Sequence, residues 1–174
     1  MKLLRIATKN DRIPMGDIRD MHNRSASGLR RSPHIELTVD DIEHLKQEIR
    51  EINADENTFR FNVGRRTCFS DDEGIIYVKG DVFPDLDSIH PRDMMSERAV
   101  LAHEYYGHYK FSPSRFKVSD WRDEFRASYI AAISTPNLSA DDRRYLVLDA
   151  YERAREHGRY YEYSRKAREI IYGY

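Results

Sequence analysis

Residues 103–108 of this chain, HEYYGH, place two histidines and a glutamate inside an otherwise apolar run that is typical of a helix. A regular helix turns by about 100° per residue. His103 and His108 are five residues apart, so on such a helix they would point about 140° away from each other. They can face a common point only where the helix widens by one residue, as a π-type turn does. The segment therefore predicts either a local π-turn or two histidines that share no ligand.

Gly107 lies inside the same segment and favours the π-turn. A glycine in a helix interior is unfavourable by roughly 1 kcal/mol relative to alanine. Its missing side chain, however, lets the backbone distort and lets a neighbouring backbone or a ligand approach closely. One distorted turn would therefore explain both the unusual spacing and the unfavourable glycine.

The remaining pattern predicts an α+β fold, in which a small, mainly antiparallel sheet is followed by a helical core. One strand is expected at 58–63, and segments 66–69 and 74–80 are expected to form a hairpin whose turn ends at Gly74. Apolar periodicity and capping residues predict helices in five segments, which are 38–54, 90–111, 120–134, 139–158 and, for a short last helix, part of 159–173.

The length of 174 residues fits a single domain, expected at 34–174 after an N-terminal arm or loop region at 1–33. The net charge of -1 gives no general attraction to nucleic acid or to an anionic membrane. Neither a secretory signal nor a membrane span is recognised, and a single cysteine, Cys68, rules out an internal disulfide framework. We therefore expect a cytoplasmic protein without nucleic-acid or membrane partners. Export by a route without a cleaved signal and the oligomeric state stay open.

A metal site on the first helix needs a third protein ligand. Catalytic zinc takes three ligands from histidine or carboxylate and keeps a fourth position open. The predicted helix 120–134 carries Asp123 and Glu124, which follow His108 by 15 and 16 residues. That separation allows the second helix to return antiparallel to the first, with Glu124 turned to the ion. Asp123, or alternatively Asp120, is then expected to hydrogen-bond a ligand.

These two segments resemble the motifs of the dipeptidyl peptidase III family of zinc peptidases. HEYYGH is similar to that family's HExxGH, which has the same expanded spacing. DEFRAS, at 123–128, resembles its downstream E-E-x-R-A-[ED] motif, with Arg126 and Ala127 matching and Ser128 standing where the family has an acid. The resemblance covers only these segments in a much smaller chain, so exopeptidase specificity is not implied. The pattern is also similar to small bacterial zincin-like domains of mobile elements and toxin-type proteins.

The resemblance implies a zincin-like (gluzincin-type) zinc metallopeptidase that acts on a peptide or protein substrate. It implies that His103, His108 and Glu124 bind Zn2+ and that Glu104 is the general base. Zinc lowers the pKa of its bound water to about 7, and the carboxylate takes the proton as the water attacks a carbonyl. The architecture of the family suggests 74–82 as the edge strand for the substrate. The residue that stabilises the oxyanion stays open among Tyr105, Tyr106, Tyr109, Arg126 and His157.

Other interpretations of the HEYYGH segment stay open at this point. The two histidines can be ordinary helix residues paired with nearby acids. Alternatively, Glu104 and His108, four residues apart, can bind another metal on a regular helix, which leaves His103 and Gly107 unexplained. For function, the alternatives are a catalytically silent, partner-binding zincin-like module and a hydrolase of non-peptide amides. The intact Glu104 favours an enzyme.

Overall fold

The computed structural model describes residues 32–84, 88–111 and 120–174, and these form the predicted α+β fold. The predicted arm at 1–33 therefore lies almost wholly outside the described residues. The α-helices are α2 (Val39–Glu51), α3 (Pro91–Met94), α4 (Glu97–Ala102), α5 (Trp121–Ser134), α6 (Ala140–Glu156) and α7 (Arg165–Tyr172). The strands are β1 (Phe59–Phe61), β2 (Cys68–Ser70) and β3 (Ile75–Val78). A π-helix, His103–His108, continues α4 and is followed by a 3₁₀ turn at Tyr109–Phe111.

The long helices begin where their capping residues predict. Thr38 caps α2 in a reciprocal capping box with Asp41, and Ser139 caps α6 through its side chain. Asp120 caps α5. Each of these side chains satisfies a backbone N–H group that has no partner within its own helix.

The predicted helix 90–111 is divided into α3, α4 and the π-helix. Pro91 stands at the first position of α3, and Ser96 caps α4. Ser96 also donates its hydroxyl to Asp142 of α6 at 2.9 Å, and its backbone N–H donates to the same carboxylate at 3.2 Å. These bonds fix the beginning of α4 against α6.

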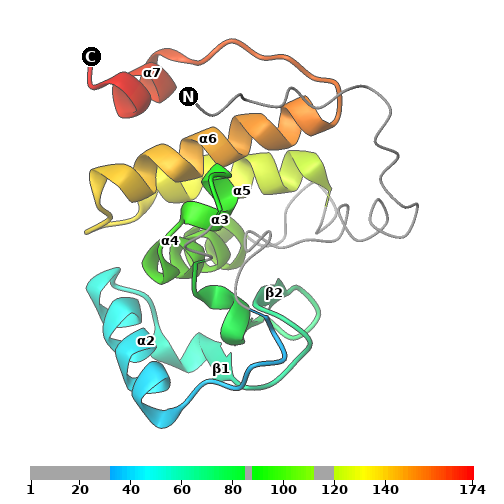
Figure 1. Cartoon of the computed structure of the whole chain (residues 1–174), viewed down its shortest axis with the longest axis vertical. Coiled ribbons are helices and arrows are strands. Elements are labelled where there is room, and N and C mark those ends of the chain that lie inside the picture. Colours follow the sequence, from blue (N-terminus) through cyan, green and yellow to red (C-terminus); the bar gives the residue numbers. More distant parts are fainter. Residues whose placement is uncertain (1–31, 85–87, 112–119) are drawn as a thin grey trace, which may run out of the picture.

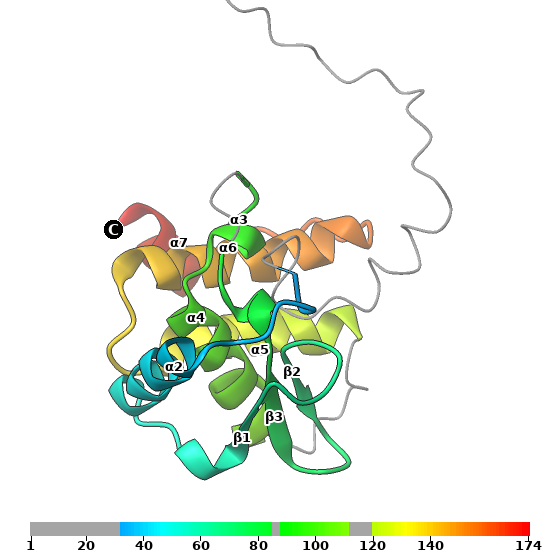
Figure 2. The same cartoon turned by 60° about the horizontal axis from the view of Figure 1, so that its bottom comes forward.

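The sheet is mixed, with the strand order β1-β3-β2, and Figure 2 shows β3 between its two neighbours. β2 and β3 form the predicted antiparallel hairpin, but β1 pairs parallel to β3. We expected a mainly antiparallel sheet, but one of the two strand pairs is parallel. The connection after β1 crosses β3 at Gly64, where a Cβ atom would come within 2.9 Å of the ring of Tyr77. This crossing carries the chain to the far edge of β3.

The helix formed by α4 and the π-helix is enclosed on both sides. Figure 1 shows α2 and the sheet on one side of α4 and the α5, α6 and α7 helices on the other. Val100, Leu101 and Ala102 are completely buried in the core that joins the two sides. Polar side chains on the continuation of this helix are therefore forced to find partners inside the protein. Within the described ranges, no helix combines the length and apolar character required to cross a bilayer.

Candidate metal centre

The π-helix at His103–His108 turns its two histidines toward each other. Their Nε2 atoms lie 3.1 Å apart, and the two rings meet nearly edge to face, with centroids 4.8 Å apart. The local widening predicted from the five-residue spacing is thus present. The regular helix on which Glu104 and His108 would bind another metal is not formed here.

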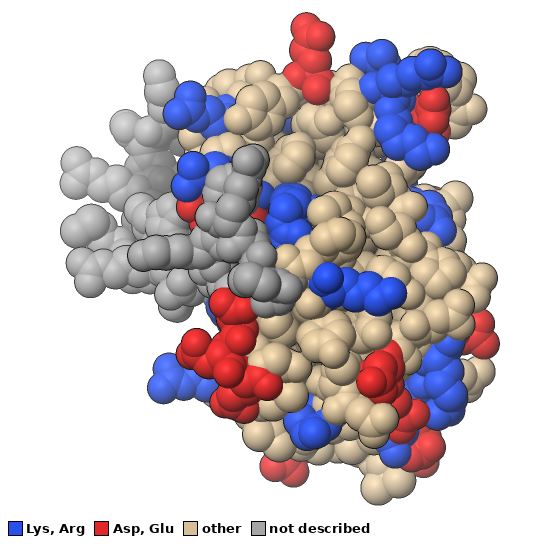
Figure 3. All heavy atoms as spheres, turned by 180° about the vertical axis from the view of Figure 1, so that it is seen from behind, with Lys and Arg blue, Asp and Glu red and all other residues tan. Residues whose placement is uncertain are grey.

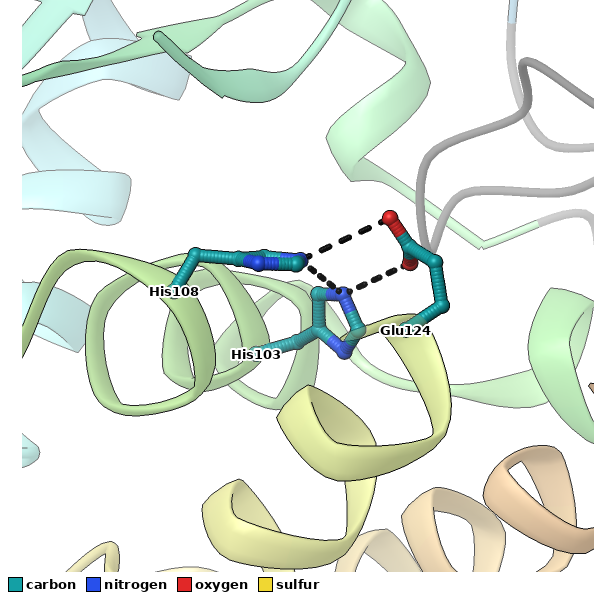
Figure 4. A group of neighbouring side chains, drawn as sticks. All are labelled: His103, His108 and Glu124. Carbon is teal, nitrogen blue, oxygen red and sulfur yellow. Dashed lines mark hydrogen bonds and ion pairs between the residues drawn. The ribbon is translucent and has the colours of Figure 1, made fainter. Parts of the chain in front are cut away.

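Glu124, in the first turn of α5, faces both histidines (Figure 4). Its Oε2 lies 3.3 Å from His103 Nε2, and its Oε1 lies 3.6 Å from His108 Nε2. All three side chains are buried, and together they form a group that could hold a metal ion. Ligand atoms around a tetrahedral zinc, bound at 2.0–2.1 Å, are separated by about 3.3 Å. The three side chains are therefore already spaced as ligands of one small ion.

Gly107 allows α5 to approach the π-helix this closely. A Cβ atom at Gly107 would lie 2.6 Å from the carbonyl oxygen of Ala127 and 2.8 Å from its Cα atom. The sequence left open whether a neighbouring backbone or a ligand approaches Gly107, and the structure shows the backbone of Ala127 there. Because Glu124 lies on the same helix as Ala127, this contact also sets the distance between Glu124 and the histidines.

Asp123 supports His108, as predicted for this position. Its Oδ2 lies 3.1 Å from His108 Nδ1, and its Oδ1 accepts hydrogen bonds from Arg126 at 2.7 and 3.1 Å. With Nδ1–H turned to a carboxylate, Nε2 is the ring nitrogen that faces the centre. Asp120, the alternative candidate, instead caps α5 and pairs with Arg122.

The charges around the centre shift the pKa values of His108 and Glu124. Burial alone would lower the pKa of His108, but the charge of Glu124 and the hydrogen bonds that the ring donates to Asp123 and Glu124 raise it to about 10. Burial alone would raise the pKa of Glu124, but the charges of Arg153 and His108 hold it well below its usual range. Without a metal ion, a proton on His108 therefore compensates the carboxylates.

Glu104 follows His103 on the π-helix, and the sheet holds its side chain. Its Oε2 accepts a hydrogen bond from the backbone N–H of Phe69 at 2.8 Å. Its Oε1 is buried and has no hydrogen-bond partner among the described residues. The expectation that 74–82 forms an edge strand is wrong, because β3 is central and paired on both sides. The edge strand that contacts this site is β2, which carries Phe69.

Most candidates for an oxyanion donor are engaged elsewhere. The Tyr106 hydroxyl donates to the carbonyl of Ile52 at 2.7 Å, and Arg126 is bound to Asp123. The ring of His157 stacks on Trp121. The other two candidates contribute ring contacts to an aromatic cluster, in which Tyr105 stacks on Phe59 and Tyr109 meets Phe69 edge-on.

The sequence interpretation missed two polar residues of α6, Asp149 and Arg153. Arg153 Nη1 lies 3.1 Å from Glu124 Oε2, and its Nε donates to Asp149 at 2.8 Å. Arg153 Nη2 is buried and finds no hydrogen-bond partner in the described part of the chain. The available signal was their spacing: two opposite charges four residues apart in a helix, next to apolar positions that prove to be buried.

A second group of possible ligands, His90, Glu152 and Glu156, lies between α3 and α6 and is partly exposed. His90 Nδ1 accepts a hydrogen bond from the backbone of Arg92, and Glu156 pairs with the Arg92 side chain. Glu152 pairs with an arginine one turn further along its own helix. These contacts account for the group without an ion.

No known protein family, curated protein or solved structure matches this chain. The chemistry of the site therefore has to be inferred from its own geometry.

Proposed function

We propose that this protein is a zinc-dependent metallopeptidase, in which His103, His108 and Glu124 hold Zn2+ and Glu104 is the general base. The observation that carries the proposal is the convergence of three buried ligand atoms at 3.1–3.6 Å. The residue after His103, Glu104, has a buried Oε1 that lacks a hydrogen-bond partner among the described residues. A buried polar atom of this kind is unfavourable unless a ligand or water satisfies it.

The types of ligand favour zinc over the hard divalent cations. Two imidazole nitrogens and one carboxylate oxygen are a frequent donor set of catalytic zinc. Calcium and magnesium prefer oxygen ligands only. The contacts at the far ring nitrogens turn both Nε2 atoms and the Glu124 carboxylate toward one point. A cation at that point replaces the proton of His108 as the charge that compensates the carboxylates.

Each residue of the site then has a distinct task in the hydrolysis of a peptide bond. Bound zinc would act as a Lewis acid and would lower the pKa of a water molecule to about 7. Glu104 accepts a proton from the attacking water at Oε1, while the Phe69 amide holds the other carboxylate oxygen in place. Asp123 keeps the His108 ring oriented.

The implied substrate is a peptide or a protein, and the edge of β2 that pairs with no strand among the described residues offers a place for an extended chain. A nucleic-acid partner is not part of the proposal, since the net charge is -1 and the face in Figure 3 carries charges of both signs. A cytoplasmic location is proposed from the use of a single cysteine.

The proposal is tested by preparing metal-free protein, titrating it with zinc and then digesting casein and a peptide library. We expect about one zinc per chain, together with cleavage of peptides that stops on addition of a chelator and returns with zinc. Tight binding of zinc without cleavage of any peptide would overturn the peptidase and would favour a partner-binding module.

The proposal also predicts how the affinity for zinc changes with pH. His108 has a pKa of about 10 in the metal-free protein, so zinc must displace its proton at neutral pH. We expect about one proton to be released per zinc and the affinity to rise about tenfold per pH unit between about pH 6 and 9. Calorimetry in buffers of different ionisation enthalpy measures the released protons. An affinity that is independent of pH over this range would contradict the assignment of His108 as a ligand.

A further inference from the structure

His103 is held at its outer nitrogen by a hydroxyl group instead of a carboxylate. His103 Nδ1 lies 3.0 Å from Ser128 Oγ, and Ser128 Oγ lies 2.6 Å from Asp149 Oδ2. All three side chains have an exposed fraction of 0%. They form a continuous buried chain of hydrogen bonds that runs from the π-helix through α5 to α6.

The direction of this chain follows from the charge of Asp149. Arg92 Nε donates to one carboxylate oxygen at 2.7 Å, and Arg153 Nε donates to the other at 2.8 Å. Burial alone would raise the pKa of Asp149, but Arg153 and Arg92 hold it well below its usual range. An ionised carboxylate can only accept, so the Ser128 hydroxyl donates to Asp149. The Ser128 oxygen is then left to accept from the Nδ1–H group of His103.

We propose that Ser128 and Asp149 are positioning residues that fix His103 in the tautomer with its proton on Nδ1 and its lone pair on Nε2. The inference deepens the proposed function and rests on it. Asp149 also orients Arg153, whose Nη1 reaches Glu124, so one buried carboxylate supports two of the three ligands. The motif that DEFRAS resembles has an acid at the position of Ser128. In this protein the carboxylate comes from Asp149 of α6, and the Ser128 hydroxyl links it to His103.

The difference between the two histidines makes the inference specific. His108 meets the carboxylate of Asp123 directly, at 3.1 Å, whereas His103 reaches Asp149 only through Ser128. Removal of the Ser128 hydroxyl therefore affects the tautomer of His103 and leaves the signals of the His108 ring, which Asp123 holds, unchanged. A purely structural role of Ser128 in packing would not distinguish between the two rings.

The tautomer of His103 and the signals of the His108 ring are measured by NMR of the imidazole nitrogens in the metal-free protein at neutral pH. In the wild type we expect His103 to carry its proton on Nδ1. In Ser128→Ala we expect His103 to shift toward the Nε2–H form or a mixture, while Ser128→Thr, which keeps the hydroxyl, restores the wild-type signals. Release of zinc to a chelator is expected to be about 10–100-fold faster in Ser128→Ala.

Thr135→Val is the matched control. Thr135, at the end of α5, has a buried hydroxyl without a hydrogen-bond partner among the described residues, so its removal should change neither the tautomers nor the release of zinc. Asp149→Asn should reproduce Ser128→Ala where it folds. Unchanged His103 signals and unchanged zinc release in Ser128→Ala overturn the inference. A wild type that binds no zinc, but whose His103 signals shift in Ser128→Ala, overturns the proposed function and leaves the positioning pair supported.

Discussion

Replacement of Glu104 by glutamine is expected to abolish peptide hydrolysis while the protein keeps its zinc. Glutamine has the size of glutamate and can still accept the Phe69 N–H bond, which is 2.8 Å long in the wild type. Its amide group, however, cannot take a proton from water. Positioned general bases contribute about 10²–10⁴-fold to a rate, so we expect kcat/KM to fall by at least about 10²-fold. Zinc content stays unchanged, because Glu104 is outside the group of candidate ligands.

Glu97→Gln is the control for this substitution. Glu97 lies in the first turn of α4, on the same continuous helix, and pairs with His44. Loss of the Glu97 charge should change kcat/KM by less than about twofold, because exposed ion pairs contribute little to stability. Full activity in Glu104→Gln would show that another group is the base. Loss of zinc from Glu104→Gln would instead make Glu104 a ligand.

Replacement of Gly107 by alanine is expected to destabilise the protein and to weaken zinc binding, although alanine is the better helix former. Helix propensity alone predicts a gain of about 1 kcal/mol. The added Cβ atom would instead lie 2.6 Å from the Ala127 carbonyl oxygen and 2.8 Å from its Cα atom. Backbone atoms cannot rotate away, so α5 must move together with Glu124. Overpacking of this kind typically lowers the free energy of unfolding by about 1–3 kcal/mol.

Denaturant unfolding and zinc titration measure the two effects of Gly107→Ala. Gly173→Ala is a useful comparison, since Gly173 ends α7 with a φ of +81° and a Cβ atom there would meet nothing within 4 Å. It should lower stability through its backbone conformation alone and leave zinc affinity unchanged. A Gly107→Ala protein that is more stable than the wild type and binds zinc equally well would show that the close contact with α5 does not position the site.

The π-turn and the convergence of Glu124 on the two histidines could be predicted from the sequence, the first from local geometry and the second from helix spacing together with the resemblance to a zinc-peptidase motif. Two histidines at the wrong spacing for a regular helix, with a glycine between them, leave few backbone conformations in which they meet. Glu124 was expected at the candidate site because DEFRAS resembles a zinc-peptidase motif, and Asp123 was expected to support a histidine because adjacent helix positions point in different directions. Capping residues such as Thr38 and Ser139 also mark their helix starts within the sequence itself.

The place of β3 and the roles of Asp149 and Arg153 could not be predicted in this way. Strand order depends on which distant segments pair, and the crossing at Gly64 leaves no periodic pattern in the sequence. Asp149 and Arg153, four residues apart, look like an ordinary exposed ion pair of a helix. Only the packing of α6 against α5 and α3 turns both side chains toward the interior.

Metal analysis of the purified protein, set beside that of His108→Ala, tests most directly whether the widened helix and α5 build a zinc site. We predict about one zinc per chain in the wild type, with two histidine nitrogens and one carboxylate oxygen at about 2.0–2.1 Å by X-ray absorption spectroscopy. His108→Ala is predicted to lose the zinc while keeping its helical content. A wild type that takes up no zinc, or a variant that retains it in full, would contradict the site.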